Sequence, residues 1–104
     1  MEIIYNGYDN VVKFQVLAYQ GNVLIPADFS GVTSMRLEIP SLALNITSGI
    51  TWTSEGEITL SDLGQAGLLP GQRPATLIAF DPSHPNGQVI VHESSGGLTF
   101  KITG

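Results

Sequence analysis

The residues best suited to chemistry in this 104-residue chain are its two histidines, His84 and His92. Asp81 and Glu93 lie near them in the sequence, so two imidazoles and a carboxylate could meet at the ends of one hairpin. Imidazole nitrogens and carboxylate oxygens are common zinc ligands. Their spacing matches no established metal motif, however, and His84 stands between two prolines in an expected loop. The pattern therefore favours solvated turn residues, and we expect no metal and no cofactor.

The other groups that could catalyse a reaction form no recognisable set. Asp9, Asp28 and Asp62 are scattered over turns, where aspartates commonly close Asx turns, whereas calcium needs several oxygens at one point. Glu55 and Glu57 are too close along the chain for a glycosidase pair. The chain has neither a Gly-x-Ser-x-Gly elbow nor a cysteine nucleophile. We therefore assign no catalytic residue and expect a protein that is not an enzyme.

Residues suited to contact with a partner gather near the N-terminus. Tyrosine is enriched at interfaces and in sugar-binding sites because it combines apolar area with a polar tip, although tyrosines also border cores. Residues 1–10 precede the main strand pattern, so they form either an interaction arm or an edge strand. The interface candidates are Ile3, Ile4, Tyr5, Tyr8, Tyr19 and the outward-facing pair Arg36 and Glu38.

Composition excludes several classes of partner. Four cations against nine acidic residues, a net charge of -5, cannot form a phosphate-binding patch, so we expect no nucleic acid. No apolar run approaches the roughly 20 residues that span a bilayer, and the start lacks a signal peptide's basic region, so we expect no membrane role. Charged residues make up only 12%, and a weakly charged polar surface is cheap to desolvate against a neighbour.

The elements that hold these residues are expected to be short strands. Strict alternation over residues 32–39 puts Met35, Leu37 and Ile39 on one face, which predicts a half-buried antiparallel strand. Residues 75–80 are apolar on both faces, which is typical of a strand in mid-sheet. Residues 61–71 interrupt the pattern and predict at most one helical turn. Further candidate strands cover residues 2–5, 11–19, 23–25, 42–46, 50–53, 57–60, 88–92 and 98–102.

The length predicts one domain, residues 1–104, with Trp52 as a core anchor. About seven to nine short strands with turns between them indicate an all-β antiparallel β-sandwich, which we favour over a small barrel.

The pattern also resembles a known family, the immunoglobulin-like domains of tailed-phage virion proteins. It is similar to the N-terminal domains of baseplate upper proteins and to small capsid decoration or accessory proteins. The residues that carry the resemblance are Lys13–Val16, the hairpin Tyr19–Pro26, Asp28–Thr33 leading into Met35–Ile39, Ile58–Leu60, Leu69–Gly71, Thr76–Asp81 and Gly87–Val91.

The resemblance implies an immunoglobulin-like sandwich and a non-enzymatic virion structural protein, assembled in the host cytoplasm. Because the sequence stops at Gly104 without a receptor-carrying region, we expect a capsid decoration or accessory protein docked in many copies. Its partners would be the major capsid protein, other virion subunits or further copies of itself. The alternatives are a tail, neck or baseplate accessory protein and an exposed carbohydrate-binding module.

Overall fold

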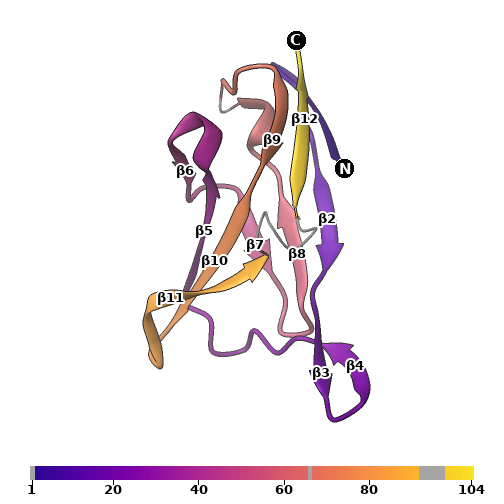
Figure 1. Cartoon of the computed structure of the whole chain (residues 1–104), viewed down its shortest axis with the longest axis vertical. Helices are drawn as coiled ribbons and strands as arrows, with labels where there is room; N and C mark the ends of the chain where they lie inside the picture. Colours follow the sequence, from indigo (N-terminus) through magenta and orange to yellow (C-terminus); the bar gives the residue numbers. More distant parts are fainter. Residues whose placement is uncertain (1, 66, 92–97) are drawn as a thin grey trace.

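The structure, a computed structural model, describes residues 2–65, 67–91 and 98–104. These residues form twelve strands and two short 3₁₀ turns, which confirms the all-β prediction. The molecule is elongated, with extents of 43 × 27 × 23 Å. Figure 1 shows the strands running mainly along its long axis.

The strands pair into three sheets and one separate hairpin. The first sheet has the order β1 (Glu2–Tyr5), β12 (Thr99–Thr103), β9 (Gly71–Pro74). The second has the order β11 (His84–Val91), β10 (Thr76–Asp81), β5 (Ser34–Ile39), β6 (Leu44–Ile46). The third has the order β2 (Val12–Gln15), β8 (Glu57–Leu60), β7 (Ile50–Trp52), and the hairpin is β3 (Leu17–Gln20) with β4 (Val23–Pro26). The 3₁₀ turns are η1 (Pro40–Leu42) and η2 (Leu63–Gln65).

One hydrophobic core joins the three larger sheets. Alternation works as predicted in β5, where Met35, Leu37 and Ile39 are buried. They share one cluster with Ile58 of β8 and Phe100 of β12. Figure 1 shows β5 and β10 on one side and β2, β8 and β12 on the other. Sheets that share a core in this way are compatible with a β-sandwich.

Strand β10 occupies the middle of its sheet, as its two apolar faces predict. It pairs with β5 on one edge and β11 on the other. Leu77 and Ala79 are buried on one face, and Thr76 and Ile78 are buried on the other. Trp52 is partly buried and packs against the core, in keeping with an anchoring role.

The structure differs from the sequence prediction in its loops and strand ends. It has more strands than the seven to nine expected, partly because residues 11–19 form two strands separated at Val16. The expected loop over residues 81–87 is wrong, since β11 already begins at His84 after a two-residue turn. Asp81 makes this tight turn because its carboxylate accepts a hydrogen bond from the His84 amide at 2.8 Å.

The N-terminal segment is an edge strand of the domain in this structure. Strand β1 pairs in parallel with β12, with Glu2 opposite Phe100 and Tyr5 opposite Thr103. The side chain of Ile4 is fully buried in the core. For residues 1–10 the sequence predicted either an interaction arm or an edge strand, and Glu2–Tyr5 form the edge strand.

Candidate interaction surface

A hairpin of β3 and β4, residues 17–26, extends beyond the sheets, and we call it the arm. In Figure 1 it lies at the lower end of the molecule, opposite the C-terminus. It continues β2, whose pairing with β8 ends at Gln15 opposite Glu57. The Val16 amide donates to the Gly56 carbonyl at 2.8 Å, and the Val16 carbonyl accepts from Ala27 at 2.9 Å. Strand β4 therefore takes over as partner where β8 ends.

The tip of the arm is a two-residue hairpin turn. Gln20 pairs with Val23, so the connection is Gly21-Asn22, which lies in the gap between the strands predicted over residues 11–19 and 23–25. Gly21 has φ +65, a conformation that glycine adopts readily and that two-residue hairpin turns require. The turn sets the register that brings Tyr19 opposite Leu24.

The arm is apolar on both faces and is exposed along its whole length. All eight residues of β3 and β4 are exposed, including Tyr19 at 75%, Val23 at 61% and Leu24 at 49%. Residues 16–27 contain no charged side chain. A two-stranded hairpin is marginally stable alone in water, and apolar patches of this kind mark contact sites. The arm is therefore the strongest candidate for an interface.

Strand alternation divides the arm into two faces. The outer face consists of Leu17, Tyr19, Leu24 and Pro26, and the inner face consists of Ala18, Gln20, Val23 and Ile25. A cavity of about 280 Å³ lies at the root of the arm. Its apolar lining is Val16, Ala18, Ala27, Phe29, Val32, Ala79, Val89 and Ile90, and its polar lining is Asp28, Asp81 and Gln88. Because Ala18 belongs to both, the inner face runs into this cavity.

Both acidic residues of the cavity are held by groups of their own chain. The Asp28 carboxylate accepts from the Ser30 amide at 3.0 Å, and this bond lowers the pKa of Asp28. Asp81 lies 2.9 Å from the His84 ring nitrogen Nδ1, and this hydrogen bond lowers the pKa of Asp81. Each carboxylate therefore has a hydrogen-bond partner within its own chain.

A second exposed aromatic surface lies at the other end of the molecule. Tyr5 and Tyr8 are 53% and 71% exposed and, with Asp9 and Asn10, line a hollow of about 420 Å³. The Asn10 amide holds this turn by donating to the carbonyls of Tyr5 and Tyr8 at 2.9 and 2.8 Å. Because Tyr5 pairs with Thr103 beside the C-terminus, this hollow and Tyr19 on the arm lie far apart.

The remaining interface candidates differ widely in exposure. Ile4 is a correction, because its fully buried side chain packs in the core and presents no surface; its neighbour Ile3 is 48% exposed. Arg36 and Glu38 form an ion pair of 2.7 Å and are about one-third exposed. The Arg36 guanidinium also lies 5.2 Å from the centre of the Phe80 ring. The pair, which was expected to face outward, is therefore partly shielded by packing.

The structure describes only two of the four residues considered as metal ligands, Asp81 and His84. His84 and Asp81 lie together, whereas His92 and Glu93 are outside the described residues. Within residues 2–65, 67–91 and 98–104, no three His, Asp or Glu side chains group as metal ligands would. No helix in this part of the chain has the length and apolar character needed to cross a bilayer.

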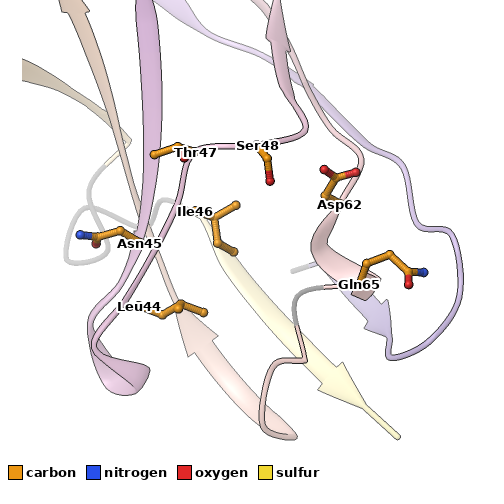
Figure 2. A pocket seen from close by; sticks show the side chains of 7 residues that line it. All are labelled: Leu44, Asn45, Ile46, Thr47, Ser48, Asp62 and Gln65. Carbon is orange, nitrogen blue, oxygen red and sulfur yellow. The ribbon is translucent and has the colours of Figure 1, made fainter.

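A polar cavity of about 430 Å³ lies between β6 and η2 (Figure 2). Its lining consists of Leu44, Asn45, Ile46, Thr47, Ser48, Asp62 and Gln65. These residues offer hydroxyls, amides and one carboxylate. No imidazole, thiol or amine lies among them to act with Asp62 as an acid–base pair. The cavity therefore suggests no reaction.

Sequence reasoning identified only Tyr19 from the arm. The signal it missed is the combination of a twelve-residue stretch without charge and apolar residues on both faces of the hairpin. No protein-family model, curated protein or solved structure matches this chain.

Proposed function

We propose that this protein is a non-enzymatic structural component of a bacteriophage particle, with an immunoglobulin-like β-sandwich that docks in many copies. We place it first on the capsid, as a decoration or accessory protein. The alternative is the same structural role in the tail, neck or baseplate. The observation that carries the proposal is the arm, a charge-free hairpin exposed on both faces. The assignment to a phage particle rests on the resemblance of the sequence to phage virion domains.

Burial of the arm would supply the main driving force for docking. Its large apolar side chains expose on the order of 500 Å², which is at the upper end for a free monomer. Removing that area from water contributes about 12 kcal/mol before the costs of association are subtracted. Many copies on a symmetric particle would add their contacts through avidity.

Co-sedimentation of the purified chain with its phage particles tests this function. We expect the wild-type chain to pellet with the particles and Leu24→Asp to remain in the supernatant, because a carboxylate on the arm cannot be buried cheaply. The matched control is Leu69→Asp, since Leu69 is 63% exposed but lies outside the arm. The proposal fails if the wild-type chain does not bind and mass spectrometry finds none of it in mature particles.

The hollow at Tyr5 and Tyr8 supports a second candidate, carbohydrate binding, because exposed tyrosine rings stack on sugars. Under this alternative, Tyr8→Ala should abolish binding on a glycan array. Tyr19→Ala should leave binding unchanged, since Tyr19 lies at the other end of the molecule. An array without a hit for the wild-type chain removes this candidate.

A further inference from the structure

We propose that the arm binds a second copy of this chain in a repeating head-to-tail contact. The outer face of one arm packs on the inner face of the next arm and into the cavity at its root. The inference rests on the proposed function in taking the arm as the contact surface, and it names the partner.

The first argument is that both faces of the arm require cover. Leu17, Tyr19 and Leu24 project from the outer face, and Val23 and Ile25 project from the inner face. A two-fold dimer brings identical surfaces together, so a contact between two outer faces would leave both inner faces in water. A head-to-tail contact joins unlike faces, so every arm inside a ring or row is covered on both sides.

The second argument is the shape of the two faces. The outer face carries the bulkier pair, because Tyr19 and Leu24 are opposite each other in the register. The inner face has the smaller Ala18 near the root, where it opens into the apolar cavity of about 280 Å³. In the proposed contact, Tyr19 and Leu24 of one copy face the hollow lined by Val16, Ala27 and Phe29 of the next copy. A protruding surface against a hollow gives the shape complementarity that close packing needs.

The third argument is charge. Copies with a net charge of -5 repel each other, and a contact made through the uncharged arm adds least to that repulsion. The arm contributes no charge, and the carboxylates of Asp28 and Asp81 beside it already accept hydrogen bonds from Ser30 and His84. The two carboxylates therefore have hydrogen-bond partners within their own chain when the contact forms.

The small area of each face favours a closed ring or a long row of copies over a simple dimer. The two faces together expose on the order of 500 Å² of large apolar side chains, so each face offers well under the roughly 800 Å² that one partner contributes to a standard interface. One contact is therefore weak. A ring in which every copy makes two contacts, or a row seated on a particle, gains the multiplied affinity that one pair lacks.

Two neighbouring residues allow a direct test, because Leu24 lies on the outer face and Val23 on the inner face. The wild-type chain, Leu24→Asp, Val23→Asp and an equimolar mixture of the two variants are compared by sedimentation velocity up to several hundred micromolar. Circular dichroism checks that both variants fold, which we expect because both positions are exposed. Each aspartate should weaken the contact about 100-fold or more, since it would be buried without a partner.

The expected result at the highest concentrations is a wild-type oligomer larger than a dimer, monomers for each variant alone, and a weakly bound one-to-one pair in the mixture. The pair forms because each variant keeps the face that the other lacks. The proposal is overturned if Val23→Asp alone still dimerises, which would indicate a two-fold contact of outer faces, or if the mixture stays monomeric.

A wild-type chain that is monomeric throughout would also overturn it. If that monomer still pellets with particles through Leu24, the proposed function stands and the partner of the arm is another virion subunit. If it floats with phosphatidylcholine–phosphatidylglycerol vesicles and Leu24→Asp does not, the arm binds lipid, and the second-copy proposal is wrong.

Discussion

Leu37→Ala is expected to lower the free energy of unfolding by about 3–5 kcal/mol, because it removes a fully buried side chain and leaves a cavity. Leu37 lies directly opposite Leu77 in the β5–β10 ladder, so the cavity would open at the centre of the core. Urea denaturation followed by Trp52 fluorescence measures the change. The Leu24→Asp background is used to keep the chain monomeric during the measurement.

Leu69→Ala is the matched control, since the same truncation is made at a leucine that is 63% exposed. We expect its free energy of unfolding to stay within about 0.5 kcal/mol of the parent value. Equal losses for both variants would contradict the assignment of β5 to the core.

Gly56→Ala is expected to cost about 2–4 kcal/mol of unfolding free energy and to loosen the arm. Gly56 has φ +85, which disfavours alanine. An added Cβ would also lie 2.7 Å from the Val16 carbonyl and 3.0 Å from the Ala27 amide, where the arm leaves the body. Faster hydrogen exchange of the arm amides, measured in the same monomeric background, would accompany the loss of stability.

Gly31→Ala provides the comparison for this substitution. Gly31 is not at positive φ, and an added Cβ there would meet nothing within 4 Å. Its stability should stay within about 0.5 kcal/mol of the parent, with unchanged exchange in the arm. If Gly56→Ala behaves like Gly31→Ala, the backbone contacts at the root do not anchor the arm.

Local patterns predicted the strands well where one or both faces are buried. The alternation of Met35, Leu37 and Ile39 placed β5, and the continuous apolar residues of β10 placed it in mid-sheet. Turn residues also placed a hairpin turn between the strands predicted over residues 11–19 and 23–25, where the structure has Gly21-Asn22. These features depend on neighbouring residues, which a single sequence displays.

Pairing between distant segments could not be predicted in this way. The parallel contact of β1 with β12 joins opposite ends of the chain, and no local pattern encodes it. The same limit applies to the arm. Val12, Phe14, Val16 and Ala18 alternate as one strand, but their burial falls from Val12 to Ala18. Pairing with β8 stops within this stretch because β8 begins only at Glu57, just after the turn at Gly56, about 40 residues further along the chain. The projection of the arm is therefore set by a distant turn.

A density map of the assembled phage particle tests the central claim most directly. We predict that the chain occupies many symmetry-related positions, with both faces of residues 17–26 covered by neighbouring subunits. A particle that lacks the chain, or one in which Tyr19, Val23 and Leu24 remain in solvent, would contradict the account.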